Sequence, residues 1–293
     1  MEKITEQLEV YLGDRRIGLL IRENGRLAFV YDRQWLDNPR SHPLSLSLPL
    51  RKTPFADFET RTWFGNLLPE GDFLNAVARR LGRSTGDIFG LLFDLGGECA
   101  GAISLLPTGK ASLEAGRYQQ FSEVDLFALV SADPPLPLLA GETGVRLSLA
   151  GAQNKVPVYV DGDKILKATG TLATTHILKP PIRAAIALPH TVQNEAFCMQ
   201  LAGKMGLVVP KAQVRAVRDQ SFYLVERFDR RSEQGRIARL HQEDFCQALG
   251  VEASSTRKVA GRRWWLFGVF CAPTARLRPW TACSCCDGSA SIS

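Results

Sequence analysis

A short segment rich in small residues has the composition of a phosphate-binding turn. Residues 146–155 read Arg-Leu-Ser-Leu-Ala-Gly-Ala-Gln-Asn-Lys, and the β-rich run 156–160 follows directly. Glycine and alanine let backbone N–H groups approach a ligand closely, which a loop that binds phosphate requires. The segment matches neither the Walker A sequence nor GxGxxG, so a tight hairpin turn without a ligand is the alternative interpretation.

Two charged residues further along the chain could act together on the same phosphates. Lys179 ends the apolar run 176–178, and Glu195 follows in a stretch with helical periodicity. A lysine that closes a buried strand can place its ammonium over bound phosphates, and a glutamate on the next helix can orient it. The alternatives are a lysine that extends to solvent at a strand end and a solvated helix glutamate.

A third group of candidate residues follows the β-rich run 222–225. Residues 226–229 read Glu-Arg-Phe-Asp. Backbone groups at such a strand end could bond the edge of an adenine, and Asp229 could bind a ribose hydroxyl. The alternative is a strand end with a surface Arg–Asp pair.

Hydrophobic periodicity predicts the elements that would position these residues. Residues 1–107 are expected to form a small α+β unit. Its β-rich runs flank Asn24-Gly25, which is a strong hairpin signal. Alternating leucines predict a further strand over 44–48, and the apolar spacing predicts a helix over 73–81.

Residues 108–144 are interpreted as a connection with one helix. Ser122 and Asp125 have the spacing of a capping box, with aspartate in place of the usual glutamate. The proline-rich stretch 132–137 would end that helix.

Residues 145–253 form the second predicted unit. It opens with a hairpin at Asp161-Gly162, and a helix with an apolar face ends before Gly206. A last helix is expected to start after Leu240. From residue 254 the composition changes, as described below.

In order along the chain, the glycine-rich hairpin, strand lysine, helix glutamate and hinge match the N-lobe of a protein kinase. The chain resembles the HipA family, the serine/threonine kinase toxins of bacterial type II toxin–antitoxin systems. This resemblance covers residues 5–253 and implies an α+β fold, in which a small N-terminal α+β subdomain precedes a protein-kinase-like N-lobe and the C-lobe is largely missing. The segments that carry it are 64–71, 90–102, 148–155, 175–179, 194–195, 225–230 and 241–250.

The resemblance implies roles for individual residues, with ATP and Mg as cofactors. Lys179 would contact the phosphates and pair with Glu195. Ser148 matches the serine that family members autophosphorylate, and a phosphate there could displace the loop. The residues expected to bind ATP are Ala150, Gly151, Ala152, Gln153, Asn154, Lys155, Lys179, Glu226, Arg227, Phe228 and Asp229.

The resemblance also implies partners. The expected partner is a small helix-turn-helix antitoxin like HipB, with operator DNA bound only through that antitoxin. The expected substrate is a protein of the translation apparatus, an aminoacyl-tRNA synthetase. No membrane partner is expected, and the absence of an export signal together with an odd number of cysteines favours the cytoplasm.

The sequence departs from the family where phosphoryl transfer requires an aspartate base and metal ligands after the hinge. The last asparagine is Asn194, before the hinge, so no catalytic-loop asparagine follows it. After Asp244 the one remaining aspartate is Asp287. We therefore assign no catalytic and no metal-binding residue, and expect the chain to be inactive in phosphate transfer. A non-catalytic module that docks an antitoxin is the alternative function.

Residues 254–293 have an atypical composition, with six Lys and Arg against one acid, and four of the seven cysteines. We interpret them as the product of a frameshift or truncation. A nucleic-acid-binding tail and a zinc site are the alternatives, although the cysteines lack the paired spacing of structural zinc sites.

The net charge supports this division. The whole chain carries +6, from 36 Lys and Arg against 30 Asp and Glu. Residues 254–293 contribute +5, so residues 1–253 are nearly neutral at +1. The basic character is therefore a property of the tail and does not indicate nucleic-acid binding across the fold.

Overall fold

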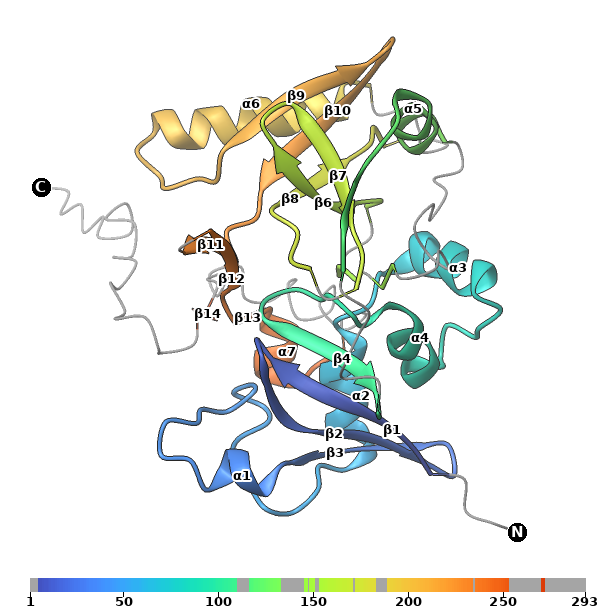
Figure 1. Cartoon of the computed structure of the whole chain (residues 1–293), viewed down its shortest axis with the longest axis vertical. Helices are drawn as coiled ribbons and strands as arrows, with labels where there is room; N and C mark the ends of the chain where they lie inside the picture. The colour runs from blue at the N-terminus through green and yellow to red at the C-terminus, as the bar shows by residue number, and fades with distance from the viewer. Residues whose placement is uncertain are drawn as a thin grey trace, which may run out of the picture.

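The computed structural model describes residues 5–109, 116–132, 145–146, 148–150, 153–170, 172–182, 189–233, 235–252 and the backbone of 270–271. Within these residues the chain forms two large antiparallel sheets, one in each half of the molecule (Figure 1), and two two-stranded ones. The first has the strand order β3-β2-β1-β4 and the second the order β5-β7-β6-β8-β10-β9. Helices pack on both sheets, so the α+β class predicted from the sequence is confirmed.

The first sheet begins with two consecutive hairpins. Asn24 and Gly25 have φ angles of 49° and 76°, the left-handed conformation that a two-residue hairpin turn requires, so this predicted hairpin is confirmed. The strands of this sheet are β1 (Thr5–Leu12), β2 (Arg15–Glu23), β3 (Arg26–Tyr31) and β4 (Ile103–Pro107).

Helices α2 and α4 pack against the first sheet and close the larger of the hydrophobic cores. Trp63 and Phe64 of α2 are fully buried there with Phe29 and Phe55. The predicted helix over 73–81 is present as α3. The helices of this unit are α1 (Arg33–Leu36), α2 (Asp57–Gly65), α3 (Gly71–Arg80) and α4 (Ile88–Leu95).

The strand predicted over residues 44–48 is wrong. Leu44 and Leu48 are buried, but Leu46 between them is exposed and this segment forms no strand. Its hydroxyl groups bind a distant part of the chain instead. Ser45 Oγ and Ser47 Oγ both donate to the carbonyl oxygen of Gln247, at 3.3 and 2.5 Å.

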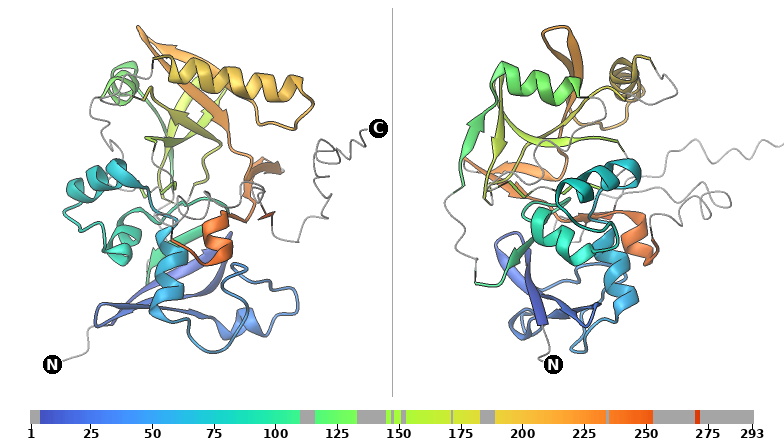
Figure 2. Two further views of the ribbon diagram at one scale, coloured as in Figure 1. Left: turned by 180° about the vertical axis from the view of Figure 1, so that it is seen from behind. Right: turned by 90° about the vertical axis from the view of Figure 1, so that its right-hand side faces the viewer.

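Residues 241–252 come late in the sequence but pack on the first unit. β13 (Gln242–Glu243) and α7 (Phe245–Leu249) lie beside α2 in both views (Figures 1 and 2). Gln247 Nε2 donates to Trp63 O at 3.3 Å, and Asn66 Nδ2 donates to Val251 O at 3.0 Å. The predicted helix after Leu240 is therefore present, and it completes the unit that residues 5–107 build.

A partly buried histidine in this contact makes stability depend on pH. His241 Nε2 donates to Leu44 O at 2.7 Å, while its Nδ1 has no partner among the described residues. Burial, together with nearby His42, lowers the pKa of His241 to about 4, against the hydrogen bond to Leu44. The unfolded chain then binds more protons between pH 6.5 and 4, so stability falls as the pH falls through this window.

As the pH falls from 7 to 5, we expect the protonation equilibrium of His241 to lower the free energy of unfolding by about 2 kcal/mol. Urea unfolding at both pH values measures this, with His241→Gln as the matched variant, since glutamine keeps a donor and does not titrate. An equally steep pH dependence of the wild type and of His241→Gln would contradict the assignment of this effect to His241.

The second sheet carries the candidate residues. Its strands are β5 (Tyr118–Gln120), β6 (Val156–Asp161), β7 (Lys164–Ala168), β8 (His176–Lys179), β9 (Ala212–Val217) and β10 (Gln220–Glu226). Strands β6 and β7 form the hairpin predicted at Asp161-Gly162.

Two helices flank this sheet. α5 (Glu123–Ser131) begins at Ser122, whose Oγ accepts from the backbone N–H of Asp125 at 3.1 Å, so the predicted cap is confirmed. α6 (Thr191–Lys204) packs on β9 and β10 (Figure 1). None of the helices in the described part of the chain combines the length and the apolar character needed to cross a bilayer.

A small hairpin of β11 (Arg230–Glu233) and β12 (Arg236–Arg239) follows the second sheet. Farther on, β14 (Phe270–Cys271) pairs with β13. The rest of residues 254–293 lies outside the described residues. The frameshift interpretation, the nucleic-acid-binding tail and the zinc site stay predictions for that segment, and the coding DNA in the neighbouring frames would test the first.

Candidate functional site

Lys179 and Glu195 meet where β8 faces α6. Lys179 is the last residue of β8, a strand that lies between β6 and β10 in the sheet. Its Nζ forms an ion pair with Oε1 of Glu195, and both side chains are largely buried. Lys179 Nζ also lies 5.6 Å from the ring centroid of Tyr223 on β10. The two residues are therefore in contact as the sequence predicted, while their role in ATP binding stays a prediction.

The described part of the glycine-rich loop supplies a second cation. Lys155 Nζ donates to the carbonyl oxygen of Ala150 at 2.6 Å, which closes the loop from one side to the other. Burial lowers the pKa of Lys155, and the positive charge of Lys179 lowers it further. The two ammonium groups therefore influence each other's charge. Gly151 and Ala152 lie outside the described residues.

The donors in this region fit a phosphate group. Lys155 and Lys179 provide positive charge, and the Oδ1 of the buried Asn154 has no partner in the described structure. An amide oxygen accepts hydrogen bonds, so this atom adds no donor for a phosphate. We name Lys179, Glu195, Ala150 and residues 153–155 the candidate phosphate site. The described residues hold no group of three His, Cys, Asp or Glu that could bind a metal, and the assignment of no metal-binding residue stays a prediction.

The hinge residues are placed less simply than the sequence predicted. The Glu226 N–H donates to Lys211 O at 2.8 Å, and the Arg227 N–H donates to Thr175 O at 2.9 Å. These two N–H groups therefore serve the sheet and are not free for an adenine edge. Phe228 follows directly and its side chain is exposed, and the contact of the hinge backbone with adenine stays a prediction.

Asp229 is not available to a ribose hydroxyl, which corrects the prediction. Its Oδ1 accepts from Arg227 Nε at 2.9 Å, and its Oδ2 accepts from Arg227 NH2 at 2.7 Å and from the N–H of Gly101 at 2.8 Å. The alternative of a surface Arg–Asp pair is also wrong, because the pair is buried. The side chain of Arg227 likewise points into the protein and does not line an adenine pocket.

Arg227 and Asp229 belong to a larger group that we name the buried charge cluster, formed by Glu98, Arg227, Asp229 and Arg230. Arg230 lies 2.8 Å from Glu98 and 2.9 Å from Asp229. Burial opposes ionisation of both acids, but the charges of the arginines outweigh it and lower the pKa of Glu98 and of Asp229. Two carboxylates and two guanidiniums make the cluster neutral, as a buried group of charges requires.

The sequence does not predict this cluster. Glu98 and Arg230 lie within segments that carry the family resemblance, but the sequence pattern gives neither of them a role. The signal that could have identified Glu98 is an acid placed between glycines, in residues 96–101, next to a buried strand.

Ser148 is buried against the first unit. Its Oγ donates to Leu67 O at 2.6 Å, and its N–H donates to Glu98 O at 2.9 Å. A kinase could therefore reach the Ser148 hydroxyl only if this part of the loop left its position. Autophosphorylation at Ser148 stays a prediction.

We expect Ser148→Ala to destabilise the chain by about 1–3 kcal/mol, because Leu67 O loses its donor in a buried place. Urea unfolding measures the loss. Ser131→Ala is the control, because it removes a hydroxyl that donates to the carbonyl oxygen of Phe127 within its own helix, and it should cost less. Ser122→Ala is unsuitable as a control because it removes a helix cap. Equal stability of Ser148→Ala and wild type would contradict the contact.

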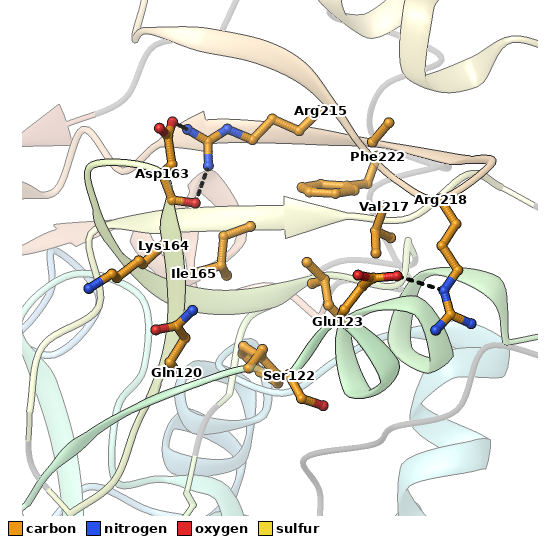
Figure 3. Close-up of a pocket in the computed structure, with 13 residues that line it drawn as sticks. Gln120, Ser122, Glu123, Asp163, Lys164, Ile165, Arg215, Val217, Arg218 and Phe222 are labelled. Carbon is orange, nitrogen blue, oxygen red and sulfur yellow. Dashed lines mark hydrogen bonds and ion pairs between the residues drawn. The ribbon is translucent and has the colours of Figure 1, made fainter.

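A separate pocket of about 470 Å³ opens at the edge formed by β5, β7, the β9–β10 turn and the start of α5 (Figure 3). Ion pairs from Arg215 to Asp163 and from Arg218 to Glu123 cross its rim, and the apolar side chains of Ile165, Val217 and Phe222 point toward it. None of the predicted ATP-binding residues lines it. This pocket is therefore distinct from the candidate phosphate site.

Comparison with known families finds two matches that lie side by side along the chain. The HipA N-terminal domain family matches residues 8–106, and the HipA-like C-terminal domain family matches residues 147–263.

Two curated relatives match more than four fifths of this chain, and both are described as kinases. A Sinorhizobium fredii protein described as a candidate kinase, Y4mE, is 46% identical over 252 residues, which are 83% of this chain and 59% of that protein. The serine/threonine-protein kinase toxin HipA of Shewanella oneidensis is 33% identical over 254 residues, 85% of this chain and 57% of that protein. The chain thus spans a little under three fifths of the length of these relatives.

A solved structure shares the fold. The complex of Shewanella oneidensis HipA with HipB and its operator DNA contains a chain that matches with a TM-score of 0.70 and 32% identity, over 85% of this chain and 57% of that chain.

Proposed function

Because the chain belongs to the HipA family of kinase toxins, we propose that residues 145–230 form the half of a kinase cleft that binds ATP. The single observation that carries this is the ion pair between Lys179 and Glu195, next to the second lysine, Lys155. A strand lysine oriented by a helix glutamate is how kinases hold the phosphates of ATP.

In this proposal each residue has a defined task. Lys179 binds phosphate oxygens, and Glu195 keeps its ammonium in place. Lys155, whose Nζ donates to Ala150 O in the structure, binds a phosphate oxygen in its place. Phe228 provides the backbone N–H for the adenine.

We further propose that a polypeptide of these 293 residues binds ATP without transferring phosphate. Kinases take the catalytic aspartate and the metal-binding residues from the segment after the hinge, and this segment contains no asparagine and, after Asp244, one aspartate. In relatives with a complete cleft the proposed substrate is a protein of the translation apparatus, an aminoacyl-tRNA synthetase.

The test combines binding and transfer. Titration calorimetry of the 293-residue chain with ATP, with and without Mg, should give saturable binding to one site. Labelled ATP should transfer no phosphate to Ser148 or to a synthetase. Absence of ATP binding would overturn the first proposal, and phosphate transfer that is lost in Lys179→Ala would overturn the second.

A second candidate function is a module that docks an antitoxin, because the matching solved structure is a complex of HipA with HipB and operator DNA. The 293-residue chain should then retain a small helix-turn-helix protein of the HipB type in a pull-down. It should retain operator DNA only when that protein is present. Direct binding of DNA without the antitoxin would favour the tail as the nucleic-acid contact instead.

A further inference from the structure

Residues 96–101 connect α4 to β4 and enter the contact between the two halves of the molecule. From this segment Glu98 binds three separate parts of the proposed ATP site. We propose that Glu98 is a positioning residue, through which the N-terminal unit sets the geometry of the loop, the lysine strand and the hinge. This inference rests on the proposed function above.

The first connection is to the loop. The Glu98 N–H donates to Arg146 O at 2.8 Å, and Glu98 O accepts from the Ser148 N–H at 2.9 Å. Gly97 permits this approach, because a Cβ there would lie 2.7 Å from the Cβ of Arg146. The backbone of Glu98 therefore holds the start of the glycine-rich loop against the first unit.

The second connection is to the strand that carries Lys179. Oε1 of Glu98 accepts from both the N–H and the Oγ1 of Thr174, at 2.9 and 3.0 Å. Thr174 is fully buried and lies just before β8. A shift of Glu98 would thus move the start of the strand whose end carries the phosphate-binding lysine.

The third connection is to the hinge. The same Oε1 accepts from Arg230 at 2.8 Å and lies 3.5 Å from Arg227, and these two arginines flank Phe228. The side chains of Glu98, Arg227 and Arg230 are at most 3% exposed. Without the charge of Glu98, two buried arginines would face Asp229 alone, and the hinge would have to rearrange or admit water.

This arrangement makes coupling between the halves reciprocal. Whatever binds the N-terminal unit and moves residues 96–101 changes the affinity for ATP, and ATP changes the affinity for that partner by the same factor. The N-terminal unit is then part of the nucleotide site and not only a docking surface.

Hydrogen exchange of the full chain without ligand tests the positioning directly. In Glu98→Gln we expect faster amide exchange in residues 145–150, 172–179 and 226–230, with unchanged exchange in β1, β2 and β3. Glu123→Gln is the matched control, because it makes the same chemical change in the exposed ion pair with Arg218.

ATP affinity supplies the second readout. We expect Glu98→Gln to weaken ATP binding about tenfold. Leu8→Ala, a core truncation in β1 far from the loop, should lose stability and keep wild-type affinity. Because the defect is one of charge balance, Glu98→Gln combined with Arg230→Gln should recover part of the affinity and of the slow exchange.

The outcomes separate the two proposals. A wild-type chain that does not bind ATP overturns the proposed function, and the exchange result still decides whether Glu98 positions the three segments. Unchanged exchange in Glu98→Gln overturns the positioning role. So does ATP affinity equal to wild type in a chain that does bind ATP.

Discussion

Lys179→Ala is expected to weaken ATP binding by about 10- to 100-fold, since a hydrogen bond to a charged group contributes about 1.5–3 kcal/mol. The variant removes one of the two cations in the candidate phosphate site. It also leaves Glu195 without its partner beside the position of the phosphates, where a carboxylate would repel them. Titration calorimetry with ATP measures the loss.

Two further variants isolate the cause. Lys164→Ala removes an exposed lysine from the same sheet, at the pocket of Figure 3, and should leave ATP affinity unchanged. Glu195→Gln in the Lys179→Ala background should recover part of the binding, because it removes the repulsion. An equal loss in Lys164→Ala would mean that ATP responds only to net charge, which would contradict a specific site at Lys179.

Arg227→Met is expected to lower the free energy of unfolding by about 3–5 kcal/mol, the usual cost of removing one partner from a buried group of charges. Arg227 donates to Asp229, to Thr174 Oγ1 at 3.1 Å and to Cys99 O at 3.2 Å. Methionine fills part of the volume but leaves Glu98 and Asp229 with one arginine between them. For a chain of this size the loss corresponds to a fall in Tm of about 6–20 °C.

Arg218→Met provides the control for this loss. Arg218 is half exposed and pairs with Glu123, and such surface pairs contribute about 0–1 kcal/mol. Urea unfolding of the two variants should therefore differ by several kcal/mol. Similar losses of unfolding free energy in both variants would show that the buried charge cluster contributes no more to stability than a surface ion pair.

Several local features could be predicted because neighbouring residues determine them. The hairpin at Asn24-Gly25 follows from the left-handed conformation of these two residues, and the cap at Ser122 follows from a side chain that reaches its own helix. The contact of Lys179 with Glu195 was predictable from the order of strand and helix, once that order matched a kinase N-lobe.

Predictions failed where a distant segment decided the outcome. The alternation over residues 44–48 has the pattern of a strand, yet Ser45 and Ser47 bind Gln247, about two hundred residues away. Asp229 was expected to bind a ribose hydroxyl from its place after a strand. It is instead held by Arg227 and Arg230, close to it in the sequence, and by the N–H of Gly101, 128 residues away, which the sequence around Asp229 does not reveal.

The sequence by itself determined the class of fold, the order of the kinase-like elements, the pair of lysines and the absence of an asparagine after the hinge. Periodicity and turn residues depend only on neighbouring positions in the sequence, and composition needs no structure, so these features can be recognised from the sequence alone. Only the tertiary structure decided that Glu98 joins the loop, the lysine strand and the hinge. The reason is physical: a buried charge is tolerated where opposite charges from other segments surround it, and only the folded chain brings those segments together.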